Sequence, residues 1–147
     1  FDYNGELIMK TNISDFTVVK TPTLSKKLNS THKLVNFERG DTLNFIIGNN
    51  EVSIIINEKY GEKLKTFLKG EKILNKENGL VALTIVFTSK DFMHTPGVIF
   101  TVMRKLAWDH INIFEIISTM TELTFILSKK DSMKAYNALY ELVNKED

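Results

Sequence analysis

The sequence predicts an α+β fold in which two similar units each pack helices on one face of an antiparallel sheet. The first observation behind this prediction is an internal repeat, because residues 51–68 align without gaps with residues 122–139. Both segments read as an apolar strand, a polar turn and an amphipathic helix. The second observation is the order strand, helix, strand, strand, helix after residue 79, which is the split βαβ arrangement of ferredoxin-like folds.

The two copies share a second, looser echo, in which an Asp-Phe pair precedes a Thr-Pro pair. These pairs stand at Asp15-Phe16 with Thr21-Pro22, and at Asp91-Phe92 with Thr95-Pro96. Two echoes in the same order favour a duplication. We therefore expect ferredoxin-like βαββαβ units in tandem, with a boundary near Asn78-Gly79. A degenerate domain would cover residues 1–78, and a better preserved domain would cover residues 79–147.

The first copy predicts short elements. Its predicted strands are Glu6–Ile13, Phe16–Lys20, Leu43–Ile47, Val52–Ile56 and Lys72–Leu74. Gly48-Asn49-Asn50 is a turn sequence, so the third and fourth of these strands are expected to form a hairpin. Pro22 begins a short helix, and Gly70 ends a second helix over Tyr60–Leu68.

The second copy has clearer patterns. Leu80–Phe87 is a nearly continuous apolar run with β-branched residues, which predicts a buried strand. After a polar loop, Thr95 supplies a capping oxygen and Pro96 suits the first helical position. Trp108–His110 close this helix. Apolar residues recur along it at helical spacing, at Val98, Val102 and Leu106.

The rest of the second copy predicts a hairpin and a helix. Ile111–Thr119 alternates between two faces and is expected to pair with Leu123–Leu127. Glu115 falls on the apolar side, which predicts either a sheet edge or contact with a partner subunit. Asp131 or Ser132 caps the last helix. Its expected apolar stripe is Met133, Tyr136, Tyr140 and Val143, with Ala135, Leu139 and Leu142 beside it. The aromatic residues expected to anchor the core or an interface are Trp108, Tyr136 and Tyr140.

Four segments of the second copy resemble the ACT domain, a small-molecule-sensing module found beside enzymes of amino-acid metabolism. They are Leu83–Phe87, Thr95–Val98, Ile111–Ile113 and Glu122–Phe125. The resemblance covers about residues 79–143 and rests on a polar loop, a Pro-Gly-Val helix start, an Asn-Ile strand start and a hairpin. The tandem pair is similar to the regulatory half of aspartokinases and to stand-alone archaeal-type regulators of amino-acid metabolism.

The chain departs from the family pattern in two places. The family's fourth strand should follow the last helix, yet the sequence stops at Asp147. Either the sheet is one strand short or an N-terminal segment such as Glu6–Ile13 fills that position, and a spare strand candidate near the N-terminus favours the second answer. In the first copy Thr23 stands where the second has Gly97, which puts a ligand site in the first copy in doubt.

A free amino acid needs backbone N–H donors for its carboxylate and a carboxylate or carbonyl group for its ammonium. The loop over Ser89–Gly97 offers both at a predicted helix N-terminus. Gly97 lets a ligand approach the backbone, Asp91 is a partner for the ammonium, and Asn112 offers one acceptor and two donors from the next strand.

The resemblance implies that a ligand sits between this loop of one domain and the second strand of a partner domain. The residues carried over by position are Asp91, His94, Thr95, Pro96, Gly97, Val98, Asn112 and Ile113. Each also has a simpler interpretation. Residues 95–97 are then an ordinary helix start, Asp91 an exposed loop acid, His94 a solvated loop histidine and Asn112 a strand end.

Composition argues against several other functions. Nineteen basic residues against eighteen acidic ones leave a net charge of +1, so we expect no nucleic-acid binding. The absence of cysteine and of closely spaced histidines predicts neither a metal site nor a cofactor. No phosphate loop or catalytic triad pattern is present, so we expect no enzyme. No apolar run approaches the ~20 residues that a membrane helix needs, and we expect a cytoplasmic location.

These patterns predict a regulatory protein that binds an amino acid or similar small metabolite at an ACT–ACT interface and controls amino-acid metabolism allosterically. We expect a homodimer or higher homo-oligomer, with a regulated enzyme as a further partner. Two alternatives stay open. The chain is a regulatory segment of an aspartokinase-like enzyme, which its start at Phe1 favours, or it is an ACT pair that has lost its ligand and serves only in oligomerisation.

Overall fold

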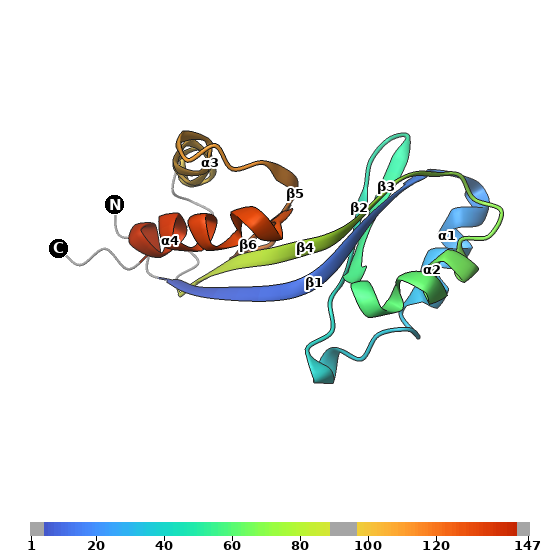
Figure 1. Ribbon diagram of the computed structural model, residues 1–147. Helices are drawn as coiled ribbons and strands as arrows, with labels where there is room; N and C mark the ends of the chain where they lie inside the picture. The colour runs from blue at the N-terminus through green and yellow to red at the C-terminus, as the bar shows by residue number, and fades with distance from the viewer. Residues whose placement is uncertain (1–4, 89–96, 144–147) are drawn as a thin grey trace. The chain divides into compact units, whose positions relative to one another are not determined.

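The computed structural model describes residues 5–88 and 97–143, and its elements confirm the predicted α+β class (Figure 1). Six strands form an antiparallel sheet in the order β2-β3-β1-β4-β6-β5. They are β1 (Gly5–Val19), β2 (Leu43–Ile47), β3 (Glu51–Asn57), β4 (Ile73–Phe87), β5 (Ile113–Ser118) and β6 (Glu122–Ser128). The α-helices are α1 (Pro22–Thr31), α2 (Gly61–Phe67), α3 (Val98–Trp108) and α4 (Ser132–Val143). Short 3₁₀ helices are η1 (Phe37–Arg39), η2 (Glu58–Tyr60) and η4 (Lys129–Asp131).

The chain divides into two compact units. The central unit comprises residues 12–80, and the terminal unit comprises residues 1–11 together with residues 81–147. Two long strands, β1 and β4, contribute residues to both units. Each has a left-handed residue next to the border, Asn12 with φ 56° and Gly79 with φ 67°. This backbone conformation is typical of a β-bulge, where one residue leaves the regular ladder.

β1 and β4 each join segments that were predicted as separate strands. β4 is continuous over Ile73–Phe87, where the sequence predicted strands over residues 72–74 and 80–87. Separate strands were expected over residues 6–13 and 16–20, yet β1 is continuous across both. Ser14 and Asp15, which interrupt the apolar pattern, are buried inside the strand. Ser14 Oγ donates a hydrogen bond to Asn78 Oδ1 at 2.6 Å. A partner on β4 therefore compensates the burial of a polar group that the sequence pattern left between two strands.

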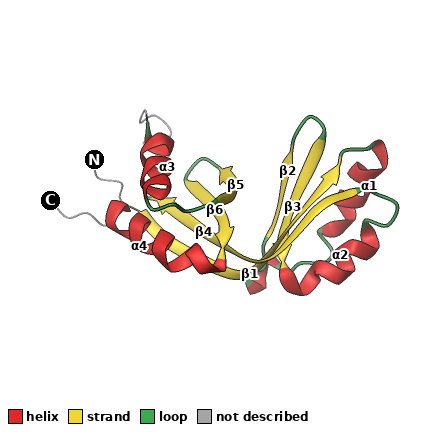
Figure 2. Cartoon of the chain, turned by 45° about the horizontal axis from the view of Figure 1, so that its top comes forward, coloured by secondary structure: helices red, strands yellow, loops and turns green. Residues whose placement is uncertain are grey.

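In the central unit, α1 and α2 cover one face of the sheet (Figure 2). α1 begins at Pro22 as predicted, and Thr21 Oγ1 accepts a hydrogen bond from the backbone N–H of Leu24 at 3.1 Å. β2 and β3 form the predicted hairpin, with Leu43 opposite Ile56. The helices and strands share one core, made of Phe16, Val18, Leu24, Leu28, Val52, Ile54, Ile56, Leu64 and Leu68.

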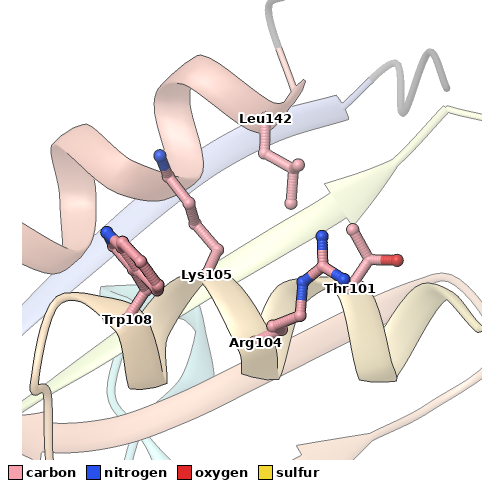
Figure 3. Close-up of a pocket in the computed structure, with 5 residues that line it drawn as sticks. All are labelled: Thr101, Arg104, Lys105, Trp108 and Leu142. Atoms are coloured by element: carbon pink, nitrogen blue, oxygen red, sulfur yellow. The ribbon is translucent and has the colours of Figure 1, made fainter.

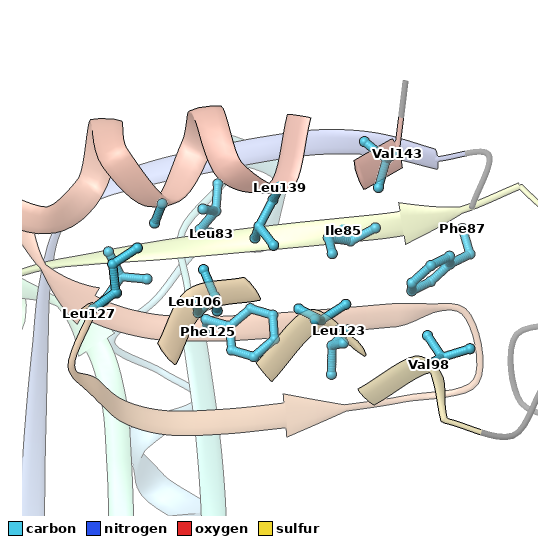
Figure 4. Packing of buried hydrophobic residues seen from close by; sticks show 13 residues of the cluster. Leu83, Ile85, Phe87, Val98, Leu106, Leu123, Phe125, Leu127, Leu139 and Val143 are labelled. Atoms are coloured by element: carbon cyan, nitrogen blue, oxygen red, sulfur yellow. The ribbon is translucent and has the colours of Figure 1, made fainter. Parts of the chain in front are cut away.

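In the terminal unit, α3 and α4 pack on a sheet whose strands follow the order β1-β4-β6-β5. The first residues of β1 lie next to β4, and Leu7 and Met9 pack against the core of this unit. The sheet of the terminal unit thus includes residues from the N-terminal part of the chain. Figure 4 shows the core between the sheet and the two helices, with side chains from β4, β6, α3 and α4.

α4 buries only part of the predicted stripe, since Val143 is buried and Tyr136 packs partly buried against the core. Met133 and Tyr140 belong to the same stripe, but they are 60% and 51% exposed. The buried residues of this helix are Ser132, Ala135, Ala138, Leu139 and Val143. Small alanine side chains let a helix approach a sheet closely, so packing selects the alanine face over the bulkier one. Trp108 is likewise outside the core, with 82% of its surface exposed.

α3 ends in a Schellman turn at His110, where the sequence predicted the end of this helix. His110 has φ 58°, and the N–H groups of His110 and Ile111 donate to the carbonyls of Ala107 and Leu106 at 3.0 and 3.1 Å. Because glycine adopts this backbone without a Cβ penalty, His110→Gly is expected to raise the free energy of unfolding by about 1 kcal/mol, measured by urea denaturation. The matched control is His32→Gly at the C-cap of α1, where φ is −57° and glycine should lower stability. A loss of stability in both variants would contradict this prediction.

Candidate functional site

The structure describes only some residues of the predicted ligand site. Asp91, His94, Thr95 and Pro96 lie outside the described residues, so their predicted roles stay predictions. Gly97, Val98, Asn112 and Ile113 belong to the described part of the terminal unit. The helix in the structure begins at Val98 with Gly97 as its N-cap, whereas the sequence placed the start at Pro96.

Gly97 gives the N-terminus of α3 an open approach. It is exposed and left-handed, with φ 79°, and a Cβ built on it would meet no atom of the described residues within 4 Å. Its carbonyl accepts the first helical hydrogen bond from the N–H of Thr101 at 2.8 Å. As a glycine, this N-cap residue has no side chain that could cap the first turn. The first-turn N–H groups and the helix dipole can therefore attract an anionic group at this position.

The other described residues have distinct environments. The Val98 side chain belongs to the core and is 3% exposed, so only its backbone is available to a ligand. Asn112 is exposed, and Ile113 begins β5 half-buried. Gly97 precedes α3 and Asn112 follows it, so the two stand at opposite ends of a helix roughly 16 Å long. One terminal unit alone does not bring these predicted site residues together.

A groove that the sequence did not predict lies between α3 and α4 (Figure 3). Its volume is about 540 Å³, and it is lined by Thr101, Arg104, Lys105, Trp108 and Leu142. Lys105 Nζ lies 3.3 Å from Glu141 Oε2. The spacing of two cations three and four positions before Trp108 places all three on one side of α3, and this spacing could have indicated the groove.

The central unit holds a carboxylate at the N-terminus of α1. Glu71 accepts hydrogen bonds from Thr21 Oγ1 at 2.5 Å, Thr23 Oγ1 at 2.7 Å and Lys27 Nζ at 2.6 Å. Its side chain is 2% exposed. The ammonium of Lys27, followed by the two hydroxyl donors, lowers the pKa of Glu71 to about 2. We call Thr21, Thr23 and Lys27 the α1 niche. Sequence reasoning missed Glu71 because it lies beyond α2.

A second buried carboxylate fixes the loop between α1 and β2. Asp41 accepts a hydrogen bond from Tyr60 Oη and another from the backbone N–H of Asn36 at 2.9 Å, and Lys59 Nζ lies 3.2 Å away. The hydrogen bond from Tyr60 is the largest cause that lowers the pKa of Asp41 to about 2, and the same bond raises the pKa of Tyr60. These groups neutralise one another, which favours a structural role for the cluster.

The described residues contain neither a cluster of metal-ligating side chains nor a membrane-spanning helix. Within residues 5–88 and 97–143, no group of three or more His, Asp or Glu side chains is placed to hold a metal ion. In the same residues, no helix combines the length and apolar character that crossing a membrane requires.

Comparison with known proteins finds structural relatives only. No protein-family model matches the sequence, and no curated protein matches it. The regulatory subunit of aspartate kinase from Thermus thermophilus, in its ligand-free form, is similar with a TM-score of 0.74 and 13% identity. The regulatory subunit from Thermus flavus is similar with a TM-score of 0.76 and 14% identity. Each alignment covers 97% of this chain and 99% of the regulatory subunit.

A longer enzyme contains a similar segment. E. coli aspartokinase III, in complex with lysine and aspartate, matches with a TM-score of 0.71 and 12% identity. That alignment covers 98% of this chain but 34% of the enzyme, so the chain spans about a third of its length. At these identities the comparisons establish architecture, and the chain has the fold of the regulatory subunits of aspartate kinases.

Proposed function

We propose that this chain is a regulatory, non-catalytic protein of the ACT type that binds a free amino acid and transmits that binding to an enzyme of amino-acid metabolism. The observation that carries the proposal is the match to isolated aspartate kinase regulatory subunits over nearly the whole of both chains. The lysine and aspartate in the complex of E. coli aspartokinase III support an amino acid as the ligand class.

The proposed site is the N-terminus of α3. The ligand carboxylate accepts hydrogen bonds from the first-turn N–H groups next to Gly97, where no Cβ blocks the approach. Asp91 takes the ammonium group, and His94, Thr95 and Pro96 complete the loop. Asn112 and Ile113 of a second copy close the site, because the same residues of one unit lie at the far end of α3. A homodimer or higher homo-oligomer follows from this arrangement.

The regulatory mechanism is differential binding. A ligand that binds one arrangement of the copies more tightly shifts the population toward it, with a coupling free energy of about 1–3 kcal/mol. The partner that reads this shift is the regulated enzyme, and we place both in the cytoplasm. No metal or cofactor has a role in the proposal.

The decisive experiment is a thermal-shift screen of the chain against the twenty common amino acids, followed by calorimetric titration. A ligand at 100 times its dissociation constant adds about 2.7 kcal/mol to the free energy of unfolding. A shift with one or a few amino acids supports sensing. No shift with any of them at millimolar concentration favours the ligand-free oligomerisation module instead.

Gly97→Val tests the position of the site. The variant is expected to weaken amino-acid binding by at least about tenfold, because a branched side chain fills the approach to the first-turn N–H groups. Gly40→Val is the matched control, since Gly40 has φ 80°, an equally open Cβ direction and a place in the central unit. Equal binding by both variants in calorimetric titration would place the site elsewhere.

A second candidate keeps the same regulatory role within a larger protein. The chain spans about a third of E. coli aspartokinase III, as a regulatory segment of such an enzyme would. The reading frame that encodes the chain separates the two candidates, because an upstream kinase domain would make this chain the regulatory part of that enzyme.

A further inference from the structure

The α1 niche has the chemistry of a carboxylate site. Two hydroxyls and one ammonium converge on the Glu71 carboxylate, and all three contacts are between 2.5 and 2.7 Å. Charge-assisted hydrogen bonds of this length are stronger than neutral ones. Thr21 Oγ1 also accepts the N–H of Leu24, so its hydroxyl links the first turn of α1 to the carboxylate. The niche is thus complete for one carboxylate and is filled by the chain itself.

The niche corresponds in sequence to the proposed ligand site of the terminal unit. Thr21-Pro22-Thr23 repeats Thr95-Pro96-Gly97, so Thr23 holds the place of Gly97. The next residue in each copy, Leu24 and Val98, is buried against the helix-covered core of its own unit. By position in the helix, Gly97, the N-cap of α3, corresponds instead to Thr21, the N-cap of α1. In either register the residue opposite Gly97 donates a hydrogen bond to Glu71. The residue by which the first copy departs from the motif is therefore a residue that binds Glu71.

We propose that Glu71 is a built-in ligand: its carboxylate takes, at α1, the place that the carboxylate of a free amino acid takes at α3. The central unit then binds no free amino acid, and each chain has one amino-acid site instead of two. The comparison with α3 rests on the proposed function, whereas the occupancy of the α1 niche by a carboxylate does not.

The turn after α2 positions the carboxylate of Glu71 in the α1 niche. Gly70 adopts φ 90°, and the N–H of Glu71 donates to the carbonyl of Leu68 at 2.9 Å, so the backbone of Glu71 is held. Lys27 Nζ also donates to the carbonyl of Lys69 at 2.8 Å, which ties α1 to the same turn. A tethered group acts at an effective concentration in the millimolar range or above, which free metabolites do not outcompete without a stronger contact.

The test removes the tethered carboxylate and offers a free one. Glu71→Ala is expected to unfold at a lower temperature than the parent chain, and about 100 mM sodium acetate is expected to restore part of that loss relative to sodium chloride at equal ionic strength. The parent chain and the control Glu62→Ala, whose side chain is 86% exposed, should respond equally to the two salts. If Glu71→Ala folds only in acetate, the proposal is supported. An identical response of Glu71→Ala to acetate and chloride, including failure to fold in both, overturns it.

Glu71→Gln provides a second test of the proposal. Its amide fills the niche without a charge, so acetate should not raise its unfolding temperature, and a rise as large as that of Glu71→Ala would contradict specific occupancy of the niche. Titration with whichever amino acid binds the parent chain should give one site per chain, and two sites would also overturn the proposal. If no amino acid binds, the proposed sensing function fails while the acetate result still decides the role of Glu71.

Discussion

Phe125→Ala is expected to lower the free energy of unfolding by about 3–5 kcal/mol. Phe125 lies on β6 with none of its surface exposed, and the side chains around it come from the sheet and both helices of the terminal unit (Figure 4). Removing the ring forfeits its burial and leaves a cavity that a close-packed core refills only in part. Urea denaturation monitored by circular dichroism measures the loss.

A matched phenylalanine on the neighbouring strand serves as the control. Phe114 lies on β5 and is 41% exposed, so Phe114→Ala is expected to cost less than about 1 kcal/mol. Similar losses in the two variants would mean that the core of the terminal unit does not centre on Phe125.

Acid is expected to destabilise the chain through Asp41 and Glu71. The pKa of each is lowered to about 2 in the folded chain, from ordinary values of 3.8 and 4.5. A group with a lowered pKa adds stability that is fully present above its unfolded pKa and is lost as pH falls toward its folded pKa. The loss should therefore develop between about pH 5 and pH 2, and each carboxyl should account for up to about one proton taken up on unfolding.

The pH dependence of urea unfolding measures this proton uptake. Asp41→Asn and Glu71→Gln should each flatten the dependence between pH 5 and pH 2 by up to about one proton, and the double variant should show the sum because the clusters share no residue. Glu62→Gln, at an exposed side chain, should leave the slope unchanged. A slope in the single variants equal to that of the parent chain would show that these carboxyls do not govern acid stability.

Local spacing predicted the elements that depend on neighbours in sequence. The start of α1 at Pro22, the hairpin across Gly48-Asn49-Asn50 and the alternation of β5 are all in the structure. The burial of Ser14 was not predicted, because the group that accepts its hydrogen bond belongs to Asn78, on another strand. The buried face of α4 was predicted only in part, because apolar residues lie on several sides of that helix and periodicity alone does not choose among them.

The candidate site, like the fold, was predicted from the sequence only in part. The sequence singled out Gly97, which lies at the N-terminus of α3 with a left-handed backbone, and its role in ligand binding stays a prediction. The groove beside Trp108 and the α1 niche were not predicted. Both depend on side chains from separate helices or turns, whose proximity no local pattern encodes.

The amino-acid sequence by itself determined the α+β class, the repeated order of elements and the start of α1, because these follow from residue spacing and turn chemistry. Only the tertiary structure decided that β1 contributes to both units and that Glu71 meets residues 44 to 50 positions away. The physical reason is that burial and charge pairing are settled by contacts between distant segments, which form only when the whole chain packs.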